Sequence, residues 1–391
     1  MKKKLLIVTS FLPFPLSHGG AVSQYFFIDR LKKEFDLFFL VIANSKEKIE
    51  QIKRFEQIEN IKVFYLEPNK LSLFDKFKNF INYRLSKLFR LQKIDEKKMF
   101  DKNKYLIKSL KKIIKQCEID IIQIEFFHLL YLIKYLPKNK KKIFIHHEVR
   151  FKTNKNFKSG KNYEIDKNLE ISLLKKYDNV IVFNKDDFQI LKNNEIDENK
   201  IVISPFGIPN KLIFHKNISN TFDKFLFVGA SFHYPNLEGL KWFLNEIYLP
   251  NYNEISWEVH IVGIWREDFK EDYKKYTKIK FLGFVDDLGK VFENAVLLNP
   301  ILTGSGIRTK VLEAFANKVP VISTPIGAEG LYSETDQNHL MIFENEKDFL
   351  KIFENNFSNN NLAEVSEKGF EYYQKYFDEE LLLQKRLCVY R

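Results

Sequence analysis

The sequence predicts an α/β protein with two parallel sheets, each covered by helices. Short apolar runs rich in Ile, Val, Leu and Phe recur along the 391 residues, and most of these runs are continuous rather than alternating. A continuous apolar run is typical of a strand that is buried on both faces. Helical stretches separate most of the runs, and repeated strand–helix units indicate parallel sheets. The length favours two domains of roughly 200 residues each.

The apolar runs also place the strands and the boundary between the domains. The pattern restarts after a polar, proline-containing stretch that begins at Pro205, as expected of a linker. We therefore expect one domain at residues 1–215, a second at residues 216–372, and a helix at residues 373–391 that can cross back to the first domain. The expected strands are residues 5–10, 37–43, 61–66, 119–124, 143–146, 180–183, 201–204, 225–228, 259–262, 279–282, 295–299, 319–323 and 340–343.

The first sixteen residues combine three lysines with an apolar run, as a signal peptide does. Pro13 and Pro15 interrupt this run and no small-residue cleavage site follows, so a first buried strand is the favoured interpretation. No later segment offers the roughly 18 uncharged apolar residues of a membrane span. Cys117 and Cys388 have no metal-ligand spacing and fit a reducing compartment. We therefore expect a cytoplasmic protein.

Charge is divided unequally along the chain. Residues 1–200 hold 42 Lys and Arg against 25 Asp and Glu, whereas residues 201–391 hold 21 against 26. A basic first half predicts an anionic partner. Residues 70–93 form a basic segment with apolar residues at helical spacing, which predicts a helix that contacts an anionic membrane surface. The alternative is a helix that packs on its own sheet. No nucleic-acid-binding signature is present, so we expect no nucleic-acid partner.

The sharpest functional signal is the segment at residues 300–314, PILTGSGIRTKVLEA, which follows the strand expected at 295–299. Gly304, Ser305 and Gly306 predict a flexible turn. Two glycines remove the side chains that would keep a diphosphate from the backbone, and the start of a following helix favours anions.

The helix expected at residues 307–317 adds polar side chains to this turn. Arg308 in its first turn can bind phosphate oxygens through two parallel hydrogen bonds. Lys310 can add a point charge or face solvent, and the Glu313 carboxylate can accept hydrogen bonds from a pair of sugar hydroxyls. The structural alternative is a tight turn with a solvated Arg and Glu.

The first domain offers a second group of candidates. Gly20 belongs to a Gly-Gly pair before the helix expected at residues 21–35, where the pair serves either an anion or a purely structural turn. Glu125, His128 and His147 follow strand ends, which meet at one edge of a parallel sheet. We treat these three as candidates for the reaction centre, with a capping or surface carboxylate and packed histidines as the alternative. A metal pair at His146 and His147 is disfavoured because neighbours on a strand point to opposite faces.

Taken in order, these motifs resemble the nucleotide-sugar glycosyltransferases of family four along most of the chain. That family has two facing Rossmann-like domains, the GT-B architecture. The resemblance rests on Gly19-Gly20, on residues 123–125, 146–149, 204–208, 227–229, 235–236, 283–285 and 304–313, and on residues 320–330.

The resemblance implies a retaining transferase with no essential metal or other cofactor. Glu313 would hold the ribose hydroxyls of the donor, the backbone at residues 283–285 would hold the base, and Arg308 with the glycines would hold the diphosphate. Gly20 would approach the donor from the other side of the cleft. The implied donor site comprises Gly20, Gly229, Phe284, Val285, Gly304, Ser305, Gly306, Arg308, Lys310 and Glu313.

Two departures from the family pattern stand out. Ser305 occupies the position of a second Glu that usually contacts the donor sugar, and residues 229–236 lack the usual Arg and Lys. Neutralisation of the phosphates would then depend more heavily on Arg308. We interpret both departures as subfamily features.

The expected function is transfer of a sugar from a nucleoside-diphosphate sugar to a glycan or a lipid-diphosphate-linked acceptor, during biosynthesis of cell-surface polysaccharide or glycoconjugate. A lipid-linked acceptor at the cytoplasmic face of the inner membrane would account for the basic first half. Two alternatives stay open at this point. One is a nucleotide-sugar epimerase of the same architecture, and the other is a catalytically degenerate, sugar-binding scaffold.

Overall fold

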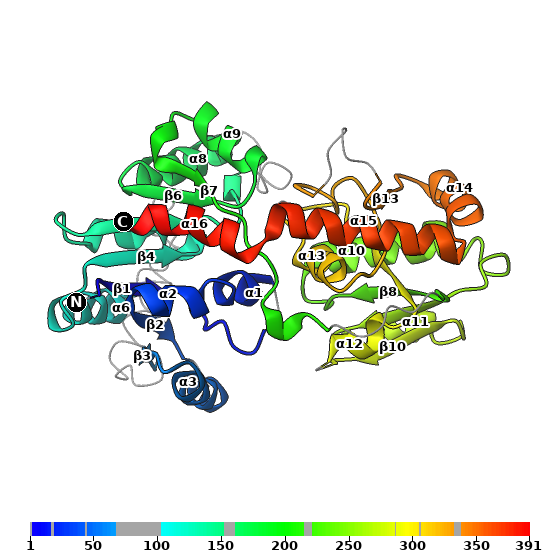
Figure 1. Ribbon diagram of the computed structural model, residues 1–391, viewed down its shortest axis with the longest axis horizontal. Coiled ribbons are helices and arrows are strands. Elements are labelled where there is room, and N and C mark those ends of the chain that lie inside the picture. Colours follow the sequence, from blue (N-terminus) through cyan, green and yellow to red (C-terminus); the bar gives the residue numbers. More distant parts are fainter. Residues whose placement is uncertain are drawn as a thin grey trace, which may run out of the picture. The chain divides into compact units, whose positions relative to one another are not determined.

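The computed structural model divides the chain into two compact units, which are described separately. It describes residues 2–16, 19–43, 45–67, 103–151, 161–214, 221–285, 287–304, 306–331 and 338–391. The N-terminal unit comprises Met1–Ser204 together with Lys385–Arg391, and the C-terminal unit comprises Pro205–Gln384 (Figure 1). The predicted α/β class with two parallel sheets is confirmed.

The N-terminal unit contains a seven-stranded parallel sheet in the order β3-β2-β1-β4-β5-β6-β7. Strand order reverses between β1 and β4, and such a switch point is where open α/β sheets bind ligands. The register pairs Ile7 with Gln123 and Glu125 with Ile145. The strands are β1 Lys4–Val8, β2 Asp36–Ile42, β3 Lys62–Leu66, β4 Ile121–Glu125, β5 Lys141–Ile145, β6 Asn179–Val182 and β7 Ile201–Ile203.

Helices cover this sheet and contribute side chains to its core. The helix expected at residues 21–35 is instead two helices, which are separated at Phe26 and Phe27. The helical elements are α1 Gly19–Tyr25, α2 Ile28–Glu34, α3 Lys46–Glu59, α6 Lys104–Gln116, the 3-10 segment η2 Phe127–Tyr135, α8 Lys161–Leu174, α9 Lys185–Asn193 and the 3-10 turn η3 Glu198–Lys200.

The C-terminal unit contains a six-stranded parallel sheet in the order β10-β9-β8-β11-β12-β13. Its core is strongly aromatic: the Phe225 ring lies 5.2 Å from Trp257 and 5.6 Å from Phe349, centroid to centroid. The strands are β8 Lys224–Val228, β9 Glu258–Val262, β10 Ile279–Gly283, β11 Ala295–Asn299, β12 Val321–Ser323 and β13 Met341–Ile342. The helical elements are the 3-10 turn η4 Asn210–Leu212, α10 Tyr234–Phe243, the π-helical turn η5 Leu244–Tyr248, α11 Glu267–Tyr273, α12 Leu288–Phe292, α13 Thr309–Ala316, α14 Glu346–Asn356 and α15 Asn359–Phe377. Helix α16 Glu379–Tyr390 begins in this unit, and its residues from Lys385 onward belong to the N-terminal unit.

The boundary between the units lies at Ser204–Pro205, earlier than the expected residue 215. The reason is that the segment after Pro205 is bonded to the C-terminal unit. The Ile208 N–H donates to the Tyr373 hydroxyl at 2.8 Å, and the Asn317 side chain donates to the Leu212 carbonyl at 3.0 Å.

Two helices occupy the end of the chain where one was expected. Helix α15 ends at Phe377, and the Asp378 carboxylate accepts a hydrogen bond from the Leu381 N–H at 3.0 Å near the start of α16. Residues 385–391 belong to the N-terminal unit. Within the ranges that the structure describes, no helix is both long and apolar enough to cross a membrane. The basic helix predicted at residues 70–93 lies outside the described residues.

The close contact between α10 and β11 gives a test of the packing. A methyl group at Gly239 would lie 2.2 Å from the Pro300 carbonyl oxygen. An alanine within a helix is ordinarily more stable than a glycine by about 1 kcal/mol. We expect Gly239→Ala to have the opposite effect and to lower the free energy of unfolding by about 2 kcal/mol, as overpacking does. Urea unfolding measures this, and the exposed Lys241→Ala on the same helix is the control. Equal or greater stability of Gly239→Ala would contradict the packing.

Candidate active site

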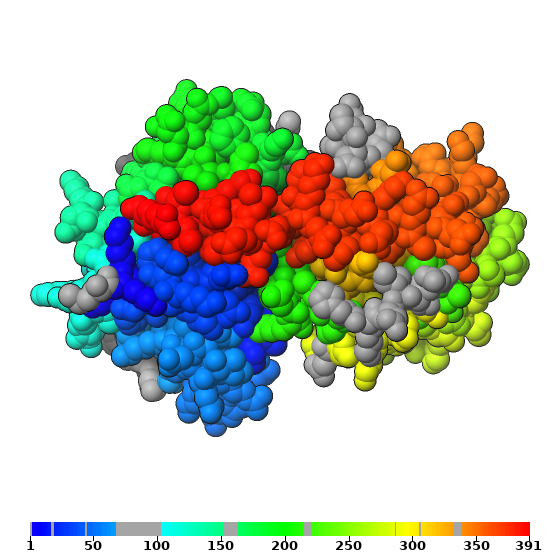
Figure 2. All heavy atoms as spheres, in the orientation of Figure 1, coloured from blue at the N-terminus to red at the C-terminus, as the bar shows by residue number. Residues whose placement is uncertain are grey.

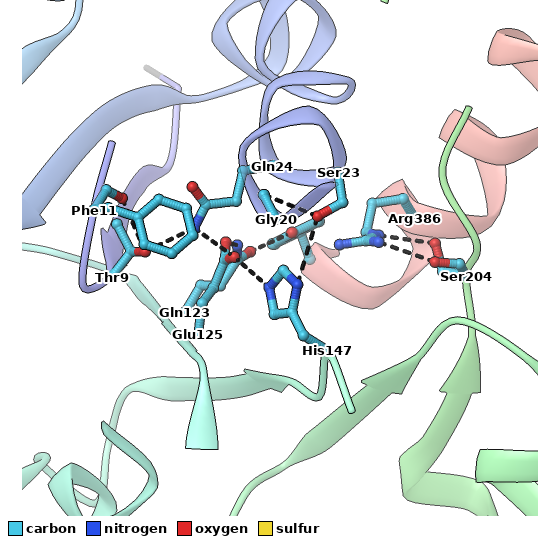
Figure 3. Close-up of polar contacts among 11 residues, drawn as sticks. Thr9, Phe11, Gly20, Ser23, Gln24, Gln123, Glu125, His147, Ser204 and Arg386 are labelled. Atoms are coloured by element: carbon cyan, nitrogen blue, oxygen red, sulfur yellow. Dashed lines mark hydrogen bonds and ion pairs between the residues drawn. The ribbon is translucent and has the colours of Figure 1, made fainter. Parts of the chain in front are cut away.

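Glu125, at the end of β4, is the centre of a buried polar network in the N-terminal unit. Its side chain is almost fully buried. Its Oε2 atom accepts hydrogen bonds from Gln24 Nε2 at 2.8 Å and from His147 Nε2 at 3.0 Å, and its Oε1 accepts from Gln123 Nε2 at 2.5 Å (Figure 3). Three donors on one carboxylate satisfy the requirement that a buried charge be hydrogen-bonded.

The ring of His147 follows β5 and is held by two aromatic neighbours and by a hydrogen bond at Nε2. It stacks on Phe126 with 4.0 Å between ring centroids and meets the edge of Phe183 at 5.2 Å. Because Glu125 accepts from Nε2, the neutral ring keeps its lone pair on Nδ1. The Ser23 hydroxyl lies 3.5 Å from Nδ1 and donates to the Gly20 carbonyl at 3.0 Å. This places a hydrogen-bond acceptor on a half-buried imidazole.

The other predicted residues of this unit, His128, His146 and Gly20, have other contacts than Glu125. His128 is exposed on η2 and stacks on Phe126 with 6.2 Å between ring centroids. His146 is buried and its Nε2 lies 2.9 Å from Glu170 Oε1, so the adjacent histidines belong to two separate pairs. Gly20 lies in the first turn of α1 and contributes its carbonyl to Ser23. Among the described residues, no group of three or more His, Cys, Asp or Glu is placed to hold a metal ion.

In the C-terminal unit, a glycine turn joins β11 to α13. Gly304 and Gly306 have φ values of +108° and +87°, a region that favours glycine. The Arg308 guanidinium lies over Gly304, since a methyl group there would be 3.2 Å from Nη2. Arg308 is the residue that precedes α13, not part of its first turn, because the helix begins at Thr309 rather than at residue 307. Ser305 lies outside the described residues.

Glu313, which is buried, and Lys310, which is partly buried, form an oppositely charged pair on α13. The Lys310 ammonium donates to the Val228 carbonyl at the end of β8, so the alternative that it faces solvent is wrong. Burial lowers the pKa of Lys310 to about 8, although Glu313 opposes this shift. Burial raises the pKa of Glu313 to about 7, and Lys310 again opposes the shift. The pair therefore titrates near neutral pH, as functional groups often do.

The other predicted donor residues lie at the carboxyl edge of the same sheet. Gly229 follows β8, where a methyl group would lie within 2.7 Å of the Phe227 ring, so close packing accounts for this glycine. Gly283 ends β10 with a φ of +72° and open space beside it. Phe284 is 57% exposed and Val285 is partly buried. The turn therefore presents a backbone and an aromatic face to solvent.

Sequence reasoning missed four polar residues of the N-terminal network: Ser23, Gln24, Gln123 and Tyr390. The Tyr390 hydroxyl on α16 donates to Gln123 Oε1, and the two residues are 267 positions apart. Lone Ser, Gln and Tyr residues carry no motif, and only the fold brings them together. A seryl, a histidyl and a glutamyl side chain are consequently aligned as Ser23, His147 and Glu125, although no Ser-His-acid set is visible in the sequence.

Comparison with known proteins agrees with this architecture. Residues 223–355 match the family model described as glycosyl transferases group 1. A protein of the cps region of Klebsiella pneumoniae, described as uncharacterized, is 25% identical over 96% of both chains.

Solved structures give the same result for the fold. A glycosyltransferase from Rickettsia africae matches with a TM-score of 0.69 and 16% identity, over 100% of this chain and 98% of that one. HepE of Anabaena in complex with UDP and glucose matches with a TM-score of 0.67 and 12% identity, over 99% of both chains. S. aureus TarM, crystallised with UDP and α-GlcNAc-glycerol, matches with a TM-score of 0.69 and 15% identity, over 100% of both chains.

Two parallel-sheet units give the chain the GT-B fold of the solved glycosyltransferases. Within the C-terminal unit, residues 223–355 match the group 1 glycosyl transferases.

The network around Glu125 predicts a measurable contribution to stability. We expect Glu125→Leu to lower the free energy of unfolding by roughly 3 kcal/mol, because buried donors of Gln24, Gln123 and His147 would lose their acceptor. Chemical denaturation measures this. Glu148→Leu removes a partly exposed carboxylate that contacts Arg150; it is the control and should change stability by less than about 1 kcal/mol. Equal effects of the two substitutions would show that the network does not stabilise the fold.

Proposed function

We propose that the chain transfers a sugar, with retention of anomeric configuration, from a nucleoside-diphosphate sugar to a glycan or lipid-diphosphate-linked acceptor of cell-surface polysaccharide. The observation that carries the proposal is the β11–turn–α13 segment, where two positive-φ glycines and the Arg308 guanidinium lie together inside the region of the family match. The cps-region relative supports a role in polysaccharide assembly, and the UDP and glucose bound by HepE support a UDP-sugar donor.

The donor groups are assigned as follows. Arg308 and the backbone amides of the glycine turn bind the diphosphate, and the turn at residues 283–285 binds the base. The Glu313 carboxylate accepts hydrogen bonds from the ribose hydroxyls, and the proximity of Lys310 partly offsets the effect of burial on the pKa of Glu313. Ser305 contacts the donor sugar in place of a carboxylate. No metal or other cofactor takes part in the proposed reaction.

The acceptor groups belong to the N-terminal unit. His147 Nδ1, with its lone pair free of the Glu125 bond, accepts a hydrogen bond from the acceptor hydroxyl and orients its oxygen. As the bond to the diphosphate breaks, the acceptor hydroxyl turns its hydrogen from His147 to the departing oxygen. The diphosphate, stabilised by Arg308, then takes this proton as the new bond forms on the same face of the sugar. Gly20 is proposed to approach the donor, and His128 is proposed to contact the acceptor.

We further propose that the enzyme works in the cytoplasm, at the cytoplasmic face of the inner membrane. The support is the charge of residues 1–200, which hold 42 basic against 25 acidic side chains. Clustered lysines attract anionic lipid surfaces. A lipid-linked acceptor would lie at the same surface.

The first test is a thermal-shift screen against UDP, GDP, dTDP, CMP and NAD. A ligand that binds only the folded state raises Tm, and stabilises by about 2.7 kcal/mol at a concentration of 100 Kd. We expect one nucleoside diphosphate to stabilise the wild type and Arg308→Ala to lose most of that shift. The exposed Lys351→Ala is the charge control. Stabilisation by NAD alone, or an unchanged shift in Arg308→Ala, would refute the assigned donor site.

Turnover of the donor then separates the three functional hypotheses. A transferase releases nucleoside diphosphate faster when acceptor is added, an epimerase changes the donor without any acceptor, and a scaffold gives no turnover. The acceptor should be close to full length, because truncated acceptors lack remote binding energy.

The raised pKa of Glu313, about 7, predicts a pH dependence of nucleotide binding. Ribose hydroxyls donate to the ionised carboxylate, so a bound donor requires Glu313 to be deprotonated. Affinity for UDP should therefore fall as pH decreases through about 7, by up to about tenfold per pH unit. Titration calorimetry between pH 5.5 and about 8.5 measures this. Glu313→Gln is the matched control: it should bind more weakly at high pH and lack this decline. Parallel pH profiles would exclude Glu313 from the site.

A further inference from the structure

A chain of hydrogen bonds runs from helix α16 to His147. The Tyr390 hydroxyl donates to Gln123 Oε1, and Gln123 Nε2 donates to Glu125 Oε1 at 2.5 Å. The other oxygen of Glu125 accepts from His147 Nε2 at 3.0 Å. Tyr390, Gln123, Glu125 and His147 all line one small cavity of the N-terminal unit. The end of α16 is thus connected to the imidazole through three successive bonds.

The end of α16 is firmly held in this unit. Arg386 is buried; its Nε donates to Ser204 Oγ at 2.8 Å and its Nη2 donates to the Ser204 carbonyl at 3.0 Å. Its guanidinium also lies 4.1 Å from the centroid of the Phe27 ring. The Tyr390 ring packs 5.5 Å from Phe35, centroid to centroid. Figure 2 shows the end of α16 lying against N-terminal residues of the same unit. Tyr390 therefore has a fixed position from which to donate.

The direction of each bond follows from the chemistry of the groups. An ionised carboxylate only accepts hydrogen bonds, so the Gln123 amide must turn its NH₂ toward Glu125 and its oxygen toward Tyr390. Burial raises the pKa of Tyr390, which keeps the phenol protonated and able to donate. If the amide turned over, its oxygen would face the carboxylate and two acceptors would repel each other. The carboxylate therefore sets the orientation of the Gln123 amide, and the Tyr390 hydroxyl stabilises that orientation from the other end.

The carboxylate is held from its other side as well. Gln24 Nε2 donates to Glu125 Oε2 at 2.8 Å and to Thr9 Oγ1 at 2.7 Å. With Gln24 and Gln123 each fixing one oxygen, the carboxylate plane is set, and it presents Oε2 to His147 Nε2. That bond decides which ring nitrogen carries the proton.

We infer that Tyr390 is a positioning residue for the transfer reaction, acting through Gln123 and Glu125 to fix the tautomer and orientation of His147. The catalytic consequence rests on the proposed function, whereas the structural consequence does not. Without the hydroxyl, the Gln123 amide oxygen loses its donor, and the Gln123 side chain is held at one end only, by Glu125. The carboxylate then loses its fixed plane, and a fraction of the imidazole carries its proton on Nδ1, where it cannot accept from a hydroxyl.

The tautomer is measured directly by NMR of ¹⁵N-histidine-labelled protein, because the two ring nitrogens have distinct shifts when only one is protonated. Spectra are recorded at mildly alkaline pH, and His147→Gln assigns the signals. We expect a single Nε2–H tautomer in the wild type and a mixture in Tyr390→Phe. The control Tyr376→Phe removes a hydroxyl from a 42% exposed tyrosine on α15 and should match the wild type.

A second variant tests the route of the effect. Gln123→Met breaks the chain one step nearer to Glu125 and should give the same mixture of tautomers. Adding Tyr390→Phe to it should change little, since residues that act through one another are not additive. A wild-type tautomer in either single variant, or an additive effect in the double variant, would overturn the inference.

Kinetics complete the test once the donor is known. We expect Tyr390→Phe to lower kcat by roughly tenfold, the effect of about 1.4 kcal/mol on the barrier, with KM for the donor unchanged. If Tyr390 has a purely structural role, Tyr390→Phe will lower Tm but will change neither the tautomer of His147 nor kcat. If the tautomer shifts and the wild type shows no transferase activity, the positioning role stands and the proposed function fails.

Discussion

A buried carboxylate must find a donor for each of its oxygens, and this requirement organises the N-terminal unit. Glu125 obtains its donors from three places in the chain: Gln24 on α1, Gln123 on its own strand, and His147 after β5. Removing a donor leaves desolvated charge without compensation. The position of α1 and the neighbouring strands β4 and β5 bring these donors to that one group, and α16 contributes a donor to Gln123.

In the C-terminal unit, a carboxylate removed from solvent is compensated by a nearby positive charge. Lys310 and Glu313 are both withdrawn from solvent, and each makes the charged state of the other less costly. Arg308 stays outside this pair, with its guanidinium over Gly304.

Much of the fold could be predicted from the sequence because strands buried on both faces leave continuous apolar runs. Each predicted strand overlaps an observed one, and the predicted GT-B resemblance is confirmed at the level of fold. Helix ends were less accurate: α13 begins two residues later than expected, because the residue before Thr309 has an extended backbone.

The site was only partly accessible to sequence reasoning. Glu125 and His147 could be proposed because each follows an apolar strand, and the glycine turn has a recognisable spacing. Gln24 and Tyr390 could not, because a single polar residue within an apolar helix face gives no periodic signal. Their partners lie 101 and 267 positions away, and only tertiary packing brings them together. The roles assigned to the site residues remain predictions.

Cys388 offers a site for chemical labelling next to the carboxylate network. Its side chain is exposed on α16, two residues from Arg386 on one side and from Tyr390 on the other. A fluorophore or spin label attached to this thiol would sit on the outer surface of the turn whose inner surface holds the carboxylate network. The mobility of such a label would report, in real time and without any substrate, whether that turn stays docked.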